Sequence, residues 1–236
     1  MVVAERFEAF SGQHFGLLAL FVAGAVGLVA LGRMQRRSSS ARLTSRVLAV
    51  AVACVAVSSQ AFQLTPGDFD PATSLPLQLC DLASVTAVWA LWSHRSLPTA
   101  LTYYWGLTLT VQGVLTPSLA EEFPHPLFFA FWALHFLVVW TALFLTFGLG
   151  LGPRWRDYRM TVVVTLAWAV VVYLVDVTWD LNYGYLVRKP ASTSLLDSMG
   201  PWPVYLLVAQ GILLAGWALM TWPWVAARRR TGSLVA

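Results

Sequence analysis

The chain has 236 residues, of which 58% are hydrophobic and 11% charged, and its formal net charge is +4. A soluble domain carries about 25% charged residues, so this composition argues against an ordinary soluble fold. Binding of nucleic acid requires a basic face or arm. Here the basic residues stand instead in short clusters between apolar runs. We therefore expect a membrane protein that binds no nucleic acid.

Apolar runs long enough to cross a bilayer, which takes about 20 residues, follow one another along the chain. We predict an all-α polytopic membrane protein whose single domain, residues 1–236, has seven transmembrane helices at about 14–32, 44–64, 75–93, 97–115, 126–148, 159–179 and 201–225. Proline is tolerated in the first turn of a helix. First-turn positions are accordingly expected for Pro76, Pro98, Pro126 and Pro201.

The distribution of basic residues predicts the orientation of these helices. Twelve of the fifteen fall before the second, fourth and sixth spans or after the seventh, and only Arg6, Arg188 and Lys189 fall on the other side. Cytoplasmic loops are enriched in Arg and Lys. The amino terminus is therefore expected outside and the carboxyl terminus in the cytoplasm, in a multi-pass protein of the cell membrane, most simply the bacterial inner membrane.

Polar side chains gather in the outer halves of the predicted spans or at their outer ends. Ionisable groups in hydrocarbon usually face a protein interior or a water-filled cavity. We therefore expect a polar cavity that opens outward. The residues assigned to it are Gln78, Cys80, Asp81, Gln112, Thr116, His125, His135, Asp176, Asn182 and Tyr183.

Each of these side chains also has a purely structural interpretation. Asp81 and Asp176 can pair with one another's helix ends or with Arg188 and Lys189, and a single His on an apolar helix often only joins two helices. We interpret Cys54 as a packing residue and His94 as a solvated loop residue. His14 lies at the edge of the first span, and the sequence suggests no partner for it.

Cys80 and His135 together suggest nucleophilic chemistry. A thiol attacks as the thiolate, and a nearby His can take its proton. The sequence alone does not establish that the third and fifth spans touch. No metal ligands are clustered within a helix, and no Lys lies in the last span to hold retinal. We expect neither a metal nor a cofactor.

Four segments resemble the bacterial YwaF-like integral membrane family. They are LPLQLCDL (residues 75–82), YYWGLTLTVQGVLTP (103–117), FPHPLFFAFWALHF (123–136), and NYGYLVRKP with SLLDSMGPWPVY (within 182–205). That family is similar to a eukaryotic transmembrane family regarded as a thiol-dependent phospholipid acyltransferase. Gln78 stands where the pattern LPLHLC has His, which weakens a version of the site with two histidines.

The resemblance implies that Cys80 is the acyl-accepting nucleophile and His135 its base. It places His125, Asn182 and Tyr183 along the same cavity, and membrane lipid is then the substrate. Two other functions remain open. The protein can be a transporter or binding protein for a small polar or amphipathic molecule, through Asp81, His135 and Asp176, or an accessory membrane subunit. The oligomeric state cannot be read from the sequence.

Overall fold

The protein is built from helices in all the residues that the computed structural model describes, 7–117, 119, 121–190 and 194–232. The helices are α1 (Gly12–Gln35), α2 (Ser40–Gln63), α3 (Leu79–Ser93), α4 (Ser96–Trp105), η1 (Gly106–Thr110), α5 (Val111–Leu115), α6 (Pro126–Leu143), η2 (Phe144–Gly148), α7 (Trp155–Trp179), η3 (Tyr183–Tyr185), η4 (Leu195–Met199) and α8 (Val204–Gly232). The expected all-α class is confirmed for these residues, which form no strand. Arg6, used in the charge distribution, lies outside them.

The chain divides into two compact units. The first unit comprises Met1–Thr65 and Leu79–Gly152, and the second comprises Pro66–Gln78 and Pro153–Ala236. The loop that precedes α3 thus belongs to the second unit, whereas α3 itself belongs to the first. That the whole chain is one domain stays a prediction.

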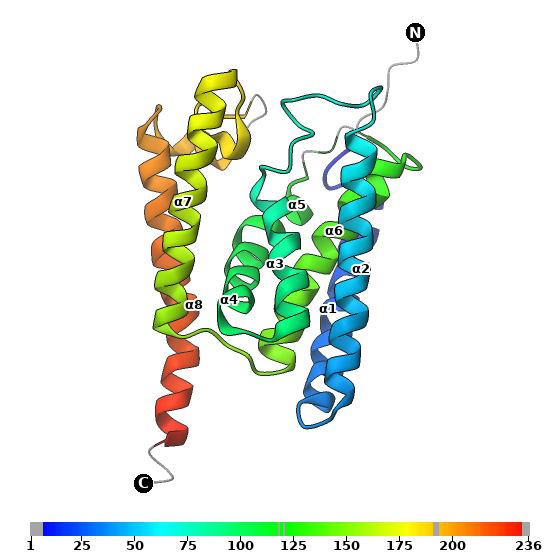
Figure 1. Ribbon diagram of the computed structural model, residues 1–236, viewed down its shortest axis with the longest axis vertical. Coiled ribbons are helices and arrows are strands. Elements are labelled where there is room, and N and C mark those ends of the chain that lie inside the picture. Colours follow the sequence, from blue (N-terminus) through cyan, green and yellow to red (C-terminus); the bar gives the residue numbers. More distant parts are fainter. Residues whose placement is uncertain (1–6, 118, 120, 191–193, 233–236) are drawn as a thin grey trace. The chain divides into compact units, whose positions relative to one another are not determined.

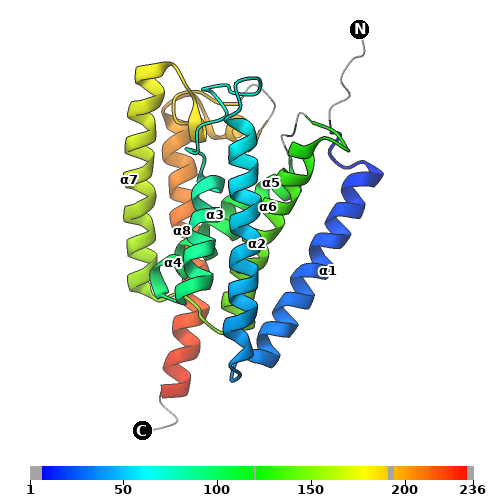
Figure 2. The same ribbon diagram turned by 45° about the vertical axis from the view of Figure 1, so that its right-hand side comes forward.

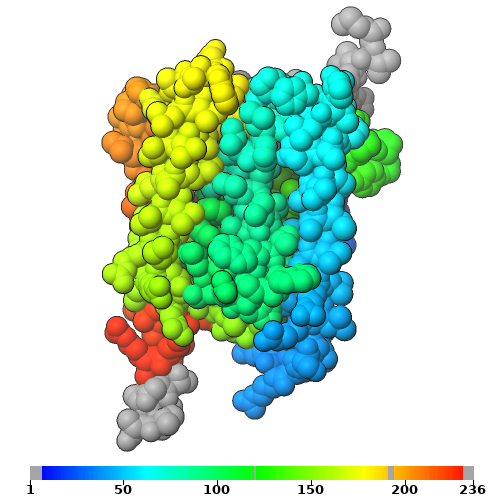
Figure 3. Space-filling model, viewed as in Figure 1, coloured from blue at the N-terminus to red at the C-terminus, as the bar shows by residue number. Residues whose placement is uncertain are grey.

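In the first unit, α3 packs against α2, α4 and α6, and α1 lies along η2 (Figures 1 and 2). The side chains of α2 and α3 meet on the face shown in Figure 3. A Cβ on Gly32 of α1 would lie 2.7 Å from the Cα of Gly148 in η2. Small residues allow membrane helices to approach closely, and here glycine is what permits the contact.

In the second unit, α7 and α8 pack side by side (Figures 1 and 2). Asp157 caps the start of α7, because its Oδ2 accepts a hydrogen bond from the backbone N–H of Arg154 at 3.0 Å. The helix ends at Asp180, whose φ of 51° is left-handed and stops helical propagation. With 25 residues, α7 is about 37 Å long.

In the described part of the chain, five helices are long and apolar enough to cross a membrane by length and composition: Gly12–Gln35, Ser40–Gln63, Pro126–Gly148, Trp155–Trp179 and Val204–Arg230. In addition, α3 is a shorter apolar helix. From Ser96 to Leu115, α4, η1 and α5 follow one another without a break, over about 30 Å. Large apolar side chains such as Val170 and Leu207 are exposed on α7 and α8, as contact with lipid requires.

Most helix boundaries lie within three residues of the predicted spans, but α2 and α7 begin four residues earlier than predicted, at Ser40 and Trp155, and α8 continues seven residues further, to Gly232. The span predicted at 126–148 coincides with α6 and η2, and Pro126 occupies the first turn as expected. Pro76 and Pro201 instead precede α3 and α8. The span predicted to start at residue 75 is therefore wrong at that end, since the helix begins at Leu79.

Candidate functional site

Cys80 lies in the first turn of α3, which brings it closer to the helix end than the predicted span implied. Its side chain is partly buried, whereas Cys54, the other free cysteine, is exposed on α2. The Cys80 thiol donates a long hydrogen bond, 3.9 Å from Sγ to Oδ1 of Asp81. The carboxylate of the next residue thus orients the thiol.

The late start of α3 has a cause in the preceding loop of the second unit. The backbone N–H of Leu75 donates to the hydroxyl of Tyr183 at 3.0 Å, and the Leu77 carbonyl accepts from Nε1 of Trp168 at 3.0 Å. The N–H of Leu77 closes a tight turn onto the carbonyl of Leu75 at 2.7 Å. The bond from Trp168 occupies the Leu77 carbonyl, which an earlier helical turn would pair with a later N–H, and the bonds to the N–H groups of Leu75 and Leu77 hold the segment as a loop.

His135 is nearly buried on α6, at 9% exposure, in the helix that packs against α3. Its Nδ1 lies 2.8 Å from the carbonyl oxygen of Phe131. A carbonyl can only accept, so Nδ1 carries the proton in the neutral imidazole and Nε2 holds the lone pair. The ring also lies on that of Phe131, with centroids 4.1 Å apart. His135 therefore presents Nε2 as an oriented basic nitrogen.

Two side chains on helices of the first unit, Trp132 and Thr110, leave polar atoms unsatisfied. Nε1 of Trp132, three residues before His135 on α6, and Oγ1 of Thr110, three residues before Gly113, are buried and have no hydrogen-bond partner in the described residues. Residues three apart share a helix face, and Gly113 itself contacts the His135 imidazole. Buried unsatisfied groups in native proteins usually mark a bound water or ligand.

The other predicted residues of the first unit lie near the ends of α5 and α6. Gln112 and Thr116 are exposed, and the Thr116 hydroxyl donates to the Gln112 carbonyl at 3.1 Å. His125 is the N-cap of α6, where its Nδ1 accepts from the N–H of Leu127 at 3.3 Å. Within the described chain, no hydrogen bond joins Cys80 to His135.

Tyr183 connects the segment that follows α7 to the loop that precedes α3. It is fully buried, and its hydroxyl donates to the Pro71 carbonyl at 2.6 Å while it accepts from Leu75. Gln78 holds the same segment, because its Oε1 accepts from the N–H of Gly184 at 3.2 Å. Gln78 and Tyr183 thus fasten the loop at 66–78 to the segment that follows α7.

The Asn182 side chain forms hydrogen bonds within its own loop. Its Nδ2 donates to the Arg188 carbonyl at 2.9 Å, and its Oδ1 accepts from the Arg188 N–H at 3.0 Å. Arg188 forms an exposed ion pair with Asp180 at 2.8 Å, and Lys189 lies 3.8 Å from Asp197. Among the described residues, the ion pairs of Arg188 and Lys189 are thus with Asp180 and Asp197, and not with Asp176.

Asp176 is fully buried near the end of α7. Its Oδ1 accepts from the N–H of Tyr183 at 2.9 Å, whereas Oδ2 has no hydrogen-bond partner among the residues described. A buried carboxylate with one unsatisfied oxygen is costly. It is therefore a candidate position for a bound proton or a polar ligand.

Two histidines that the sequence left without a role join distant segments. His14 is fully buried, with Nε2 2.9 Å from the Val114 carbonyl and Nδ1 accepting from the N–H of Phe10 at 2.9 Å. His94 is not simply solvated, since its Nε2 lies 2.8 Å from the Ser45 hydroxyl. Partial burial, together with the positive charge of Arg42, lowers the pKa of His94. No sequence signal marks either contact.

A membrane-protein family model, described as the TMEM164 family, matches residues 9–221. The chain belongs to the TMEM164 family. No curated protein and no solved structure matches it. The matched region includes every candidate site residue from Gln78 to Tyr183 but ends before Arg228.

Within this TMEM164 family member, the described residues contain no group of three or more His, Cys, Asp or Glu side chains that could hold a metal ion. The available chemistry is that of a thiol oriented by a carboxylate, a neutral imidazole with a defined tautomer, and a buried carboxylate. The first two are residues of the same unit, on helices that pack together.

Proposed function

We propose that the protein crosses the membrane seven times, with its amino terminus outside and its carboxyl terminus in the cytoplasm of a bacterial cell. Five long apolar helices support this proposal, and α3 and the run from Ser96 to Leu115 supply the other two crossings. The concentration of Arg at alternate connections supports the orientation. A cavity bearing Cys80 then opens outward.

We propose further that the protein is a thiol-dependent acyltransferase acting on phospholipid. The observation that carries this is the Cys80 thiol, partly buried and oriented by Asp81 in a helix packed against the one that bears His135. A partly buried nucleophile between apolar helices suits an acyl ester, whose chain needs an apolar environment. The resemblance of the surrounding motifs to the YwaF-like family supports the same assignment.

In the first step Sγ of Cys80 bonds to the ester carbonyl carbon, and the thiol proton passes to Nε2 of His135. The carbon–oxygen ester bond breaks, and His135 returns the proton to the oxygen of the departing lysophospholipid. In the second step the hydroxyl of another lysophospholipid attacks the thioester and regenerates the thiol. Neither step needs a metal or a redox partner.

The test is acyl transfer from phosphatidylcholine to a labelled lysophospholipid by the purified full-length protein, followed by mass spectrometry. We expect Cys80→Ala to abolish transfer and Cys54→Ala, the matched control at the exposed cysteine, to retain it. His135→Gln should reduce transfer about 100-fold or more, as loss of a general base does. Equal transfer by the Cys80→Ala protein and the wild type would refute the proposal.

The buried, unsatisfied Oδ2 of Asp176 favours a second candidate, a transporter or binding protein for a small polar molecule. In this candidate Asp176 binds the ligand or a proton, and Asp81 and His135, which the sequence also suggested, belong to the first unit. Ligand retention that fails in Asp176→Asn but survives Cys80→Ala would support this candidate. Co-purification with a fixed protein partner, without any bound lipid or small molecule, would instead indicate an accessory subunit.

A further inference from the structure

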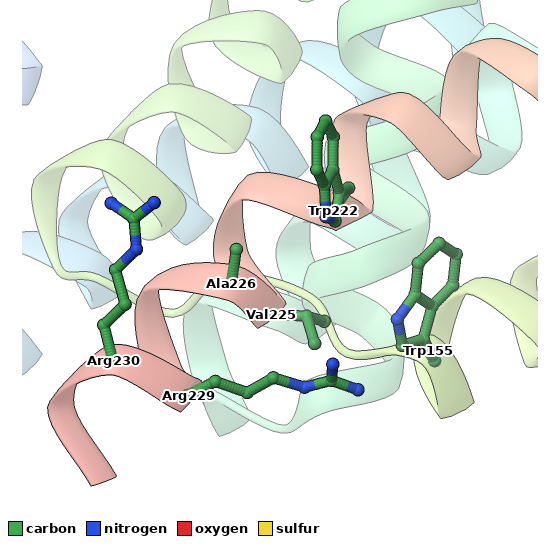
Figure 4. Close-up of a pocket in the computed structure, with 6 residues that line it drawn as sticks. All are labelled: Trp155, Trp222, Val225, Ala226, Arg229 and Arg230. Atoms are coloured by element: carbon green, nitrogen blue, oxygen red, sulfur yellow. The ribbon is translucent and has the colours of Figure 1, made fainter. Parts of the chain in front are cut away.

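A groove of about 460 Å³ lies in the second unit, between the start of α7 and the last turns of α8. Its lining residues are Trp155, Trp222, Val225, Ala226, Arg229 and Arg230 (Figure 4). In the close-up, Arg229 extends toward Trp155, while Arg230 extends to the other side of α8. The groove therefore combines aromatic and apolar walls with a guanidinium group.

At Arg229 the groove carries a positive charge that no described residue pairs with. Arg229 is exposed and forms no hydrogen bond or ion pair with any residue that the structure describes. None of the six lining residues is acidic. The nearby carboxylate of Asp157 is buried and bound to the N–H of Arg154.

The walls of the groove are held together by a neighbouring residue. Arg228 donates through Nη2 to the carbonyl of Pro153, which joins the end of α8 to the residue pair that leads into α7. Trp155 is itself supported by Tyr158, whose ring meets it edge-on at 5.7 Å. The arrangement thus does not depend on Arg229, which remains available to a ligand.

The position along the helices fits the boundary between hydrocarbon and water. Trp155 and Trp222 are 38% and 61% exposed, and indole rings favour the headgroup level of a bilayer. Beyond Trp222 the sequence of α8 changes from apolar residues to three consecutive arginines, Arg228–Arg230. Basic residues next to a transmembrane helix attract anionic lipid.

We propose that this groove binds the phosphate of an anionic phospholipid headgroup, with Arg229 as its principal ligand. A guanidinium group matches two phosphate oxygens with parallel N–H donors. Trp155 and Trp222 pack against the glycerol and the upper acyl chains. The site lies at the arginine-rich start of α7, about 32 Å along that helix from Asp176, and it goes beyond the proposed acyl transfer.

The test is native mass spectrometry of the full-length protein in detergent with added phosphatidylglycerol or phosphatidylcholine. We expect preferential retention of phosphatidylglycerol and about fivefold weaker binding in Arg229→Gln, because one basic residue near an anionic surface contributes about that factor. Arg37→Gln is the matched control, since Arg37 is an exposed arginine of the first unit. Arg229→Lys should keep most of the affinity because it keeps the charge.

Three outcomes would overturn the proposal. The first is unchanged phosphatidylglycerol binding in Arg229→Gln, and the second is an equal loss in Arg37→Gln. The third is complete displacement of the lipid by inorganic phosphate at millimolar concentration, which would identify a site for the free anion. Trp155→Ala is a second variant for the case in which Arg229→Gln does not fold, and it should also weaken binding.

Discussion

Gly113 of α5 lies directly against the imidazole of His135 on α6, so closely that a Cβ on Gly113 would come within 2.5 Å of both Cδ2 and Nε2. The imidazole has little freedom to withdraw. Its Nδ1 donates to the Phe131 carbonyl at 2.8 Å, and its ring lies on that of Phe131. The absence of a side chain at position 113 therefore determines where the basic nitrogen of His135 lies.

We expect Gly113→Ala to displace His135, to lower stability by about 1–3 kcal/mol, as overpacking does, and to reduce acyl transfer. Thermal unfolding in detergent and the transfer assay measure the two effects. The control is Gly27→Ala on α1, where an added Cβ meets nothing within 4 Å. Full activity and an unchanged melting temperature in Gly113→Ala would contradict the assigned contact.

Tyr183→Phe removes only the hydroxyl group that bonds to Pro71 and Leu75. Loss of these bonds should cost about 1–3 kcal/mol, because their backbone partners are left without a replacement. Faster hydrogen exchange at residues 66–78 should accompany the loss. Tyr173→Phe on α7, whose side chain is exposed, is the control. Equal exchange in the two variants would show that Tyr183 does not hold the loop.

Asn182 and Asp180 both contact Arg188 but should differ in importance. Asn182→Ala removes two hydrogen bonds to the Arg188 backbone and should cost about 1–3 kcal/mol. Asp180→Asn removes an exposed ion pair, which contributes about 0–1 kcal/mol, and Asn tolerates the left-handed conformation of residue 180. Denaturant titration of both variants measures the difference. A larger loss of unfolding free energy in Asp180→Asn than in Asn182→Ala would contradict this prediction.

The pKa of His94 is lowered from its ordinary value of 6.5 by burial, with a further contribution from Arg42. The unfolded chain therefore binds a proton at this residue more readily than the folded protein does. Stability contributed by the neutral form is present above pH 6.5 and is lost as the pH falls below it. Melting temperatures from pH 7.5 to 5 should fall less steeply in His94→Gln than in the wild type. An equal fall of the melting temperature with pH in the two proteins would show that His94 does not contribute to the pH dependence of stability.

The sequence located the polar side chains but misjudged the surroundings of several. His94 was interpreted as a solvated residue because it follows α3 next to Arg95, yet it bonds to Ser45 on α2. The sequence suggests Arg188 as an ion-pair partner of Asp176, but Arg188 forms its ion pair with Asp180, which is closer along the chain. Charge and sequence proximity do not specify which of two carboxylates a flexible arginine will contact.

Neighbouring groups explain why the start of α3 could not be predicted. Leu75–Gln78 is apolar enough to extend a spanning helix and contains Pro76 at an acceptable first-turn position. The bonds from Leu75 to Tyr183 and from Trp168 to Leu77 favour a loop. They join segments about 90–110 residues apart, and such pairings leave no periodic pattern in the sequence.

By itself, the sequence determined the membrane class, the helical fold and most of the helix boundaries. The hydrocarbon core of a membrane requires each spanning segment to be long, apolar and internally hydrogen-bonded. All three properties depend on residues that are close together in the sequence. Only the tertiary structure decided that His14 bonds to Val114, that Asp81 orients Cys80, and that Gly113 fixes His135. A polar side chain forms a hydrogen bond with a group that helix packing places within about 3 Å of it, and that packing depends on the whole chain.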